Sequence, residues 1–241
     1  ADVFGIAIEA AIAQNYDGIA CLAGDEGMIP FIQKAVDANI AVATYNSETN
    51  KESARAFFVG ADNYMQGREC GEKMAQLIGG KGKVAIITGF FAVEAHELRR
   101  KGFKDVLTEK YPEIVISGEV ENIDLADIAY TQAMDFMSSV PDLSGIYITA
   151  SGQFGAANAV RDNGKKGIVK VVCHDFLPET MGLVKDGVIQ GLIDQSTKLQ
   201  GRDVVIRLYN YIAGGVVPPY GKLLLDTPIA TPENVSKYVS E

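Results

Sequence analysis

The chain has 241 residues and a formal net charge of −9 at pH 7, and 47% of its residues are hydrophobic. This charge argues against nucleic-acid binding by this segment, because such binding needs a basic face for the phosphates. No apolar run approaches the roughly 20 residues that cross a bilayer, and the composition is that of a globular protein with a large core. Its three cysteines, Cys21, Cys70 and Cys173, form no CxxC pair, so we expect buried thiols and neither a metal nor a redox site.

Hydrophobic periodicity in the first part of the chain predicts three helices and three short strands. Ile6, Ala10 and Ala13 share one face, which is typical of a helix. The expected helices are Val3–Ala13, Gly27–Ala38 and one that starts at Asp62-Asn63 and runs to about Ile78, and the expected strands are Gly18–Leu22, Ile40–Tyr45 and Phe57–Val59.

The second part of the chain alternates strands and helices regularly. The expected strands are Val84–Thr88, Ile114–Ser117, Ile146–Thr149, Val169–Cys173 and Val188–Ile193, and the helices are His96–Glu109, Leu125–Ser138, Phe154–Asp162 and Glu179–Lys185. A long helix, Leu199–Ala213, ends at two glycines, and an apolar segment follows at Leu223–Leu225. This alternation predicts parallel sheets flanked by helices.

The two parts are unequal, because the second has five β units and the first only three. The first part also opens on a helix, with no strand ahead of it. We infer that this part lacks about one βαβ unit, typically ~30 residues or more. Any targeting signal, membrane anchor or DNA-binding headpiece would be missing with it. We therefore expect exposed apolar side chains on Val3–Ala13.

Candidate ligand contacts follow the ends of predicted strands. Ser151 lies just after one strand and Asp175 just after the next, and ligands of open parallel sheets bind at the carboxyl ends of the strands. Asn46 follows the strand Ile40–Tyr45, where it is either a turn-former or a ligand contact. Gln195 follows the last strand, where it serves either a hinge or a ligand.

Three motifs suggest other chemistry but fit it poorly. The glycine-lysine run Gly79–Lys83 ends a helix and precedes a strand, the reverse of a phosphate-binding loop. Gly152–Gly155, with Asp175 20 residues further on, resembles a nicotinamide site but lacks the first glycine of GxGxxG. Glu94–Glu97 contains potential metal ligands, yet all fall at a helix start, where carboxylates complement the dipole. We therefore expect no catalytic residue, no metal and no cofactor.

An ordered set of motifs resembles one family along essentially the whole chain. The motifs are Asp17-Gly-Ile, Val36-Asp-Ala-Asn-Ile-Ala-Val, Asp62-Asn-Tyr-Met-Gln-Gly, Arg99-Arg-Lys-Gly-Phe103, Pro141-Asp-Leu-Ser-Gly-Ile146, His174-Asp175, Gly187-Val-Ile-Gln-Gly-Leu-Ile-Asp-Gln195 and Thr231-Pro-Glu-Asn-Val235. They look like the type I periplasmic sugar-binding proteins of the ribose- and galactose-binding group. The same fold forms the effector domain of LacI-type repressors.

The resemblance implies an α/β fold of two doubly wound, parallel-sheet lobes with a ligand cleft between them. We expect the first lobe, which lacks its N-terminal βαβ unit, at 1–60 and 196–216, and the second at 61–195 and 217–241. By position, the resemblance assigns the ligand contacts to Asn46, Arg99, Ser151, Asp175 and Gln195, with His96 at the cleft wall. The chain departs from ribose binders at Ala150-Ser151, where they carry Asn-Asp, and at His174, where an aromatic residue is usual.

The resemblance implies a binding protein and not an enzyme. We expect it to clamp a small polar solute, a monosaccharide or polyol, and to deliver it to an ABC permease. It would then be extracytoplasmic, either periplasmic or lipid-anchored at the cell surface. The alternative is the effector domain of a LacI-type regulator, which would be cytoplasmic. His96 followed by Arg99 occurs in some regulators, whereas the Thr231-Pro-Glu-Asn segment with Tyr238 favours the transport receptor.

Overall fold

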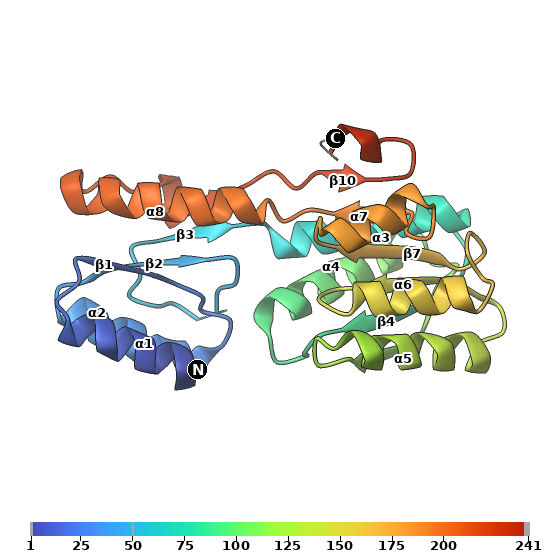
Figure 1. Cartoon of the computed structure of the whole chain (residues 1–241), viewed down its shortest axis with the longest axis horizontal. Coiled ribbons are helices and arrows are strands. Elements are labelled where there is room, and N and C mark those ends of the chain that lie inside the picture. Colours follow the sequence, from blue (N-terminus) through green and yellow to red (C-terminus); the bar gives the residue numbers. More distant parts are fainter. Residues whose placement is uncertain (1, 50, 239–241) are drawn as a thin grey trace. The chain divides into compact units, whose positions relative to one another are not determined.

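The computed structural model describes residues 2–49 and 51–238 and divides the chain into two compact units. Unit 1 comprises Ala1–Asp62, Val93–Ala95 and Gln195–Asp226, and unit 2 comprises Asn63–Ala92, His96–Asp194 and Thr227–Glu241. Each unit is an α/β layer structure whose sheet has helices on both faces, as expected (Figure 1). Residues 1, 50 and 239–241, which the expected lobe ranges include, lie outside the described residues. Within the described ranges, no helix combines the length and apolarity needed to cross a membrane.

Unit 1 contains a four-stranded parallel sheet in the order β1-β2-β3-β9. Its elements are α1 (Asp2–Ala13), β1 (Gly18–Cys21), η1 (Glu26–Met28), α2 (Ile29–Asp37), β2 (Ala41–Tyr45), β3 (Phe57–Gly60), α8 (Thr197–Gly214), η2 (Pro219–Gly221) and β9 (Lys222–Leu224). Helices α1 and α2 cover one face and α8 the other (Figure 1). Neighbouring strand residues serve opposite faces, so Val42 packs with Ile32 of α2 while Ala43 packs with Val204 of α8.

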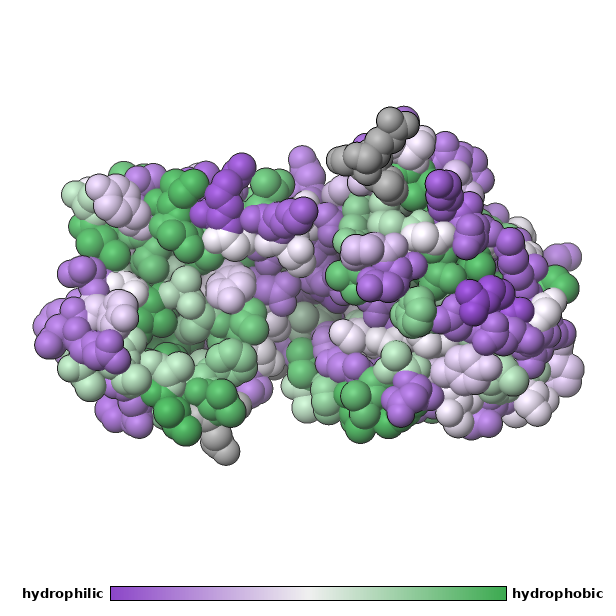
Figure 2. Space-filling model, viewed as in Figure 1, coloured by the Kyte–Doolittle hydropathy of each residue, from purple (hydrophilic) through white to green (hydrophobic). Residues whose placement is uncertain are grey.

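Large apolar side chains are exposed on two helices of unit 1, α1 and α8. On α1, Val3 is 79% and Ile6 is 68% exposed, and Val205, Ile206 and Tyr209 of α8 are exposed as well. Hydrophobic residues gather on the surface over α1 in the space-filling view (Figure 2). Apolar exposure on this helix was expected from the sequence. Strand β1 is an edge strand of the described sheet.

Unit 2 contains a six-stranded sheet in the order β10-β8-β7-β6-β4-β5. All neighbours are parallel except β10, which pairs antiparallel with β8. The elements are α3 (Asn63–Ile78), β4 (Gly82–Thr88), α4 (Glu94–Lys110, which starts in unit 1), β5 (Ile114–Glu121), α5 (Ala126–Ser139), β6 (Leu143–Ile148), α6 (Gln153–Asp162), β7 (Lys170–His174), α7 (Pro178–Lys185), β8 (Gly191–Ile193), β10 (Ile229–Ala230) and η3 (Val235–Lys237). Ile86 packs with residues of α3 and α4, and the adjacent Ile87 packs with residues of α5 and α6 on the other face.

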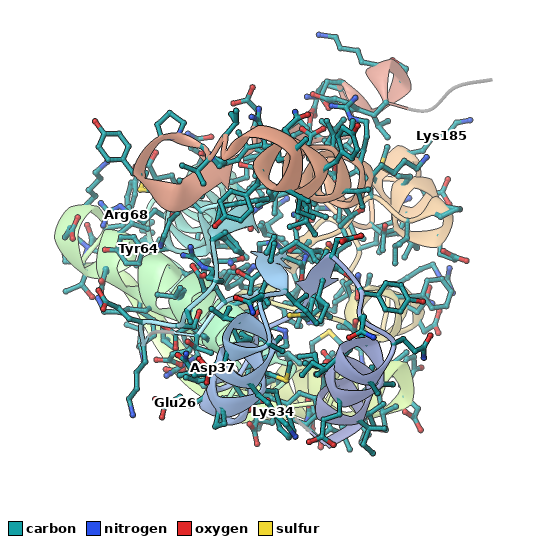
Figure 3. All side chains as sticks on the ribbon, turned by 90° about the vertical axis from the view of Figure 1, so that its left-hand side faces the viewer. Glu26, Lys34, Asp37, Tyr64, Arg68 and Lys185 are labelled. Carbon is teal, nitrogen blue, oxygen red and sulfur yellow. The ribbon has the colours of Figure 1, made fainter. Side chains whose placement is uncertain are left out.

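Glycines bring α3 and α4 into close contact. A Cβ atom at Gly67 of α3 would overlap the carbonyl oxygen of Arg99, and one at Gly102 of α4 would overlap that of Tyr64. On the outer side of this pair, the Tyr64 hydroxyl donates to Asp105 at 3.0 Å. Tyr64 and Arg68 lie one turn apart on α3 (Figure 3). This close approach allows Arg99 to reach the end of the sheet.

Residues 217–226 lie in unit 1, whereas sequence reasoning placed 217–241 in the second lobe. The physical reason is strand pairing, because β9 lies parallel to β3 with Val59 opposite Leu223. After Asp194 the chain returns to unit 2 only at Thr227, and its strand β10 then pairs with β8. A three-residue apolar strand carries no pattern that selects one sheet over another.

Candidate functional site

The six expected ligand residues divide between the units. His96, Arg99, Ser151 and Asp175 belong to unit 2, and Asn46 and Gln195 belong to unit 1. In unit 2 the parallel strands β4 to β8 all end at one edge of the sheet, which we call the carboxyl edge. Ser151 and Asp175 lie in the loops that follow β6 and β7, and His96 and Arg99 lie in the first turns of α4, which begins after the loop that follows β4.

Arg99 is a buried cation, only 3% exposed, with a fixed orientation. Its Nε donates to Asn63 Oδ1 at 2.9 Å, and its Nη1 donates to the carbonyl oxygen of Thr149 at 2.9 Å. Burial lowers the pKa of the guanidinium, and the negative charge of Asp175 opposes this effect. Because arginine stays protonated in proteins, the carboxyl edge carries a permanent positive charge.

Asp175 follows β7 directly and has a left-handed backbone with φ of 74°. Its N–H donates to the carbonyl oxygen of Ile193 at 2.8 Å, and its carbonyl oxygen accepts from Thr180 Oγ1 at 2.8 Å. The N-cap residue of α7 is Leu177, whose backbone N–H donates to Thr180 Oγ1 at 3.0 Å. Asp175 thus lies two residues before the N-cap position of α7.

His96 lies in the first turn of α4, and Ser151 lies in the loop between β6 and α6. His96 Nδ1 accepts from the Phe90 N–H at 3.2 Å. Burial, followed by the charge of Arg99, lowers the pKa of His96 to about 4, so its ring is neutral at pH 7. The Ser151 side chain is exposed, while its carbonyl oxygen accepts from Asn122 Nδ2 at 2.7 Å.

His174 is a core residue and not a stacking surface. It is fully buried, and its Nε2 lies 2.8 Å from the Tyr147 hydroxyl and 3.8 Å from Cys70 Sγ. Burial, then the charges of Arg99 and His96, lowers the pKa of this histidine well below its usual value. A neutral imidazole thus fills the position where the resembling family usually has an aromatic ring.

Asn46 and Gln195 meet within unit 1. Asn46 follows β2 with a φ of 64°, and its Nδ2 donates to Gln195 Oε1 at 3.3 Å. The backbone carbonyl of Gln195 accepts from Gln200 Nε2 at 2.7 Å. Next to Asn46, the buried Ser47 Oγ has no hydrogen-bond partner within the described part of the chain. Asn46 therefore both turns the chain and holds the side chain of Gln195.

Sequence reasoning missed the residues that position Arg99 and Ser151. These are Asn63, Thr149 and Asn122, all of them buried. Asn63 had a visible signal, its place at a helix start, but that signal indicated a cap. Nothing in the sequence distinguished Thr149 from other threonines in strands, or Asn122 from a turn-former.

The carboxyl edge offers a guanidinium, carboxylates and neutral polar groups. Planar charged groups of this kind form paired hydrogen bonds with adjacent hydroxyls, so the edge suits reversible binding of a hydroxyl-rich solute. Among residues 2–49 and 51–238, no three His, Cys, Asp or Glu side chains are grouped as a metal site would require.

Two curated relatives align with most of this chain. A D-ribose/D-allose-binding protein of Pseudomonas aeruginosa is 28% identical over 231 residues, which cover 92% of this chain and 71% of that protein. A xylose/arabinose-binding protein of Sulfolobus acidocaldarius is 26% identical over 222 residues, covering 85% of this chain and 54% of that protein.

Solved structures show the same fold. A sugar ABC transporter (sugar-binding protein) from Bacillus halodurans has a TM-score of 0.88 at 28% identity, covering 98% of this chain and 84% of that chain. An ABC transporter solute-binding protein from Burkholderia graminis, in complex with D-arabinose, has a TM-score of 0.91 at 27% identity, covering 98% and 82%. The model of the periplasmic binding protein domain family matches residues 4–215. With this match over most of its length, the chain belongs to the periplasmic binding protein domain family.

Proposed function

We propose that this chain is the solute-binding component of an ABC-type sugar importer and that it binds a monosaccharide. The observation that carries the proposal is the carboxyl edge of unit 2, where Arg99 is fixed by Asn63 and Thr149 and the carboxylate of Asp175 follows the adjacent β7. The names of the relatives support the ligand class, because they are described as binding ribose, allose, xylose or arabinose.

The chemistry of these groups explains why a sugar suits them. A carboxylate accepts two hydroxyl hydrogen bonds and a guanidinium donates several in one plane, so both match adjacent hydroxyls of a pyranose or furanose. In this proposal Asn46 and Gln195 supply further amide contacts from unit 1, and His96 and Ser151 contribute from the carboxyl edge. Binding of this kind requires no covalent step, so the chain acts as a receptor and not as an enzyme.

The same proposal includes a partner and a place in the cell. An importer needs a membrane permease that receives the sugar, and the receptor must meet the sugar outside the cytoplasm. Both solved structures reported above are named as ABC transporter binding proteins, which favours this function over the effector domain of a regulator.

Calorimetric titration tests the proposal with a panel of D-ribose, D-allose, D-xylose, L-arabinose, D-arabinose and D-apiose. We expect saturable one-to-one binding of at least one sugar and a raised melting temperature in its presence. Asp175→Asn should weaken that binding about tenfold or more, because one or more charge-assisted hydrogen bonds are lost. Asparagine tolerates the left-handed backbone at this position, so the fold is preserved.

Asp135→Asn is the matched control, because Asp135 is an exposed residue of α5 remote in sequence from every strand end. It should bind like the unmodified chain. A folded chain that binds no sugar of the panel would contradict the proposed function. Equal affinity in Asp175→Asn would contradict only the role of Asp175.

A further inference from the structure

An acid that sequence reasoning did not single out, Asp124, also lies at the carboxyl edge. It belongs to the loop that connects β5 to α5, where Ile123 and Asp124 both have left-handed backbones, with φ of 49° and 59°. The side chain of the buried Asn122 fixes this loop, because its Oδ1 accepts from the Asp124 N–H at 3.2 Å while its Nδ2 binds the carbonyl oxygen of Ser151. Two consecutive left-handed residues other than glycine are uncommon and need such support.

The carboxylate of Asp124 has one oxygen that the protein does not satisfy. The backbone N–H of Ser151 favours the charged form of the carboxylate and so acts to lower its pKa. Its Oδ1 atom is buried and has no hydrogen-bond partner in the described residues. Buried polar atoms are rarely left unpaired in native structures, and ligand sites are a common exception.

Gly89 leaves the space in which this oxygen lies. A Cβ atom at Gly89 would overlap Asp124 Oδ1 and would lie 2.8 Å from His96 Cε1. Asp124 and His96 therefore approach each other over a residue without a side chain, at the end of β4. Every larger residue at position 89 would close this space.

Two acids act on the buried Arg99. Arg99 is the cation, and both Asp175 and Asp124 act on it electrostatically. His96 and His174 are neutral at pH 7, as their lowered pKa values require. One guanidinium faces two carboxylates, so these groups together carry a charge of −1.

We propose that Asp124 is a further ligand-binding residue and that it sets the specificity for the charge of the sugar. This inference rests on the proposed function. The unsatisfied oxygen of Asp124 accepts a hydrogen bond from a ligand hydroxyl or ammonium group. The excess negative charge then selects neutral monosaccharides and amino sugars and repels sugar acids and sugar phosphates.

The alternative role for Asp124 is structural, since a carboxylate near the N-terminus of α5 stabilises the helix dipole. The two roles predict opposite effects on stability. Burial raises the pKa of Asp124, against the opposing effects of the Ser151 N–H and Arg99, so the folded state disfavours its charge. A ligand carboxylate held in this way is removed without loss of stability, whereas a helix-stabilising one is not.

Titration of the full chain with matched ligands tests this inference. The first probe is the neutral sugar of the panel that binds most tightly. The anionic probes D-galacturonate and D-ribose 5-phosphate are compared with their neutral counterparts D-galactose and D-ribose, and D-glucosamine is the cationic probe. We expect each anionic probe to bind about tenfold or more weakly than its neutral counterpart. Asp124→Asn should weaken the best neutral sugar about tenfold, leave the melting temperature unchanged or raised, and reduce the discrimination against anions.

Asp127→Asn is the matched control, because Asp127 lies in the first turn of α5 and its carboxylate accepts only from the next residue, Ile128, at 2.9 Å among the bonds described. It should leave affinity and selectivity unchanged. Unchanged affinity in Asp124→Asn, or anionic probes that bind as tightly as neutral ones, would overturn the inference while sugar binding itself persists. Failure of every sugar in the unmodified chain overturns the proposed function first.

If Asp124→Asn lowers the melting temperature, a further measurement separates the ligand-binding role from the structural role. Titration is then performed well below the melting temperature, where the fraction of binding-competent chain is read from the stoichiometry. Weakened affinity at normal stoichiometry supports the inference. Normal affinity at reduced stoichiometry assigns Asp124 to the structural role and overturns it.

Discussion

At the scale of single residues, the carboxyl edge of unit 2 shows how burial decides charge. The chain has two histidines, and both are kept neutral by burial and by Arg99. The buried arginine remains charged, as arginine does in proteins, and its Nε and Nη1 are paired with Asn63 and Thr149. The same environment that neutralises imidazole thus preserves a cation able to hold hydroxyl oxygens.

We expect His96 to contribute a measurable dependence of stability on pH. Its folded pKa of about 4 lies below the unfolded value, so the unfolded chain binds more protons in the window between them. Stability is therefore complete above about pH 6.5 and falls as the pH decreases toward 4. Between pH 7.5 and 5.5, His96 should account for a loss of about 1 kcal/mol.

The variant His96→Asn isolates this effect, because its side-chain oxygen can accept from the Phe90 N–H as Nδ1 does. Urea unfolding of both proteins at pH 7.5 and 5.5 gives the loss of unfolding free energy between these pH values for each protein. The variant should lose about 1 kcal/mol less than the unmodified chain. Identical losses would show that His96 titrates normally in the folded state.

At the scale of elements, the contact between α3 and α4 places Arg99. The backbones approach so closely at Gly67 and Gly102 that no side chain fits at either position. This approach lets a residue of α4 bond to Asn63 at the start of α3 and to the strand end at Thr149. The positions of these glycines therefore determine the geometry of the candidate site.

We predict that Gly67→Ala destabilises the chain by about 1–3 kcal/mol, because the new methyl group meets the backbone of Arg99 and neither helix can yield locally. The displaced Arg99 should also bind sugar more weakly. Gly201→Ala is the control, since Gly201 is exposed within α8 and a Cβ there meets nothing within 4 Å. It should stabilise the chain by about 0.5–1 kcal/mol in the same urea unfolding measurement. A neutral Gly67→Ala would mean that α3 and α4 separate freely.

At the scale of the whole molecule, the two units differ in how much apolar surface they bury. The buried clusters of unit 2 cover both faces of a six-stranded sheet. Those of unit 1 are smaller, and its helices α1 and α8 expose large apolar residues. Since buried apolar area is the main favourable term in folding, unit 1 should be the less stable of the two.

The reactivity of the three native cysteines measures this difference in stability between the units, so no substitution is needed. Cys21 lies in β1 of unit 1, and Cys70 and Cys173 lie in unit 2, all of them buried. Burial raises the pKa of Cys21 to about 11 and of Cys70 to about 12, so modification requires local opening. In pulsed alkylation at increasing urea, read by mass spectrometry, Cys21 should react at a lower concentration than the other two.

Equal reaction of all three thiols in concentrated urea is the control for intrinsic reactivity. A single midpoint shared by the three would show that the units unfold together and would contradict the difference in stability.

The sequence by itself determined the type and order of most elements and the α/β class. Hydrophobic periodicity is a local property, and helices and strands bury their faces with periods of 3.6 and 2 residues. The rule that ligands bind at the carboxyl ends of parallel strands then selected Ser151 and Asp175 as candidates, and the likeness to a family of sugar binders added Arg99. Their role as sugar contacts stays a prediction.

Only the tertiary structure decided which groups surround these candidates. The partners of Arg99 lie 36 and 50 positions away along the chain, and His174 packs on Cys70, 104 positions away. Contacts at such separations leave no periodic signal, so the sequence predicts a helix cap at Asn63 and does not single out Asp124. The pairing of β9 with β3 in unit 1 also depends on the tertiary structure, because no local sequence pattern specifies which sheet edge a short strand joins.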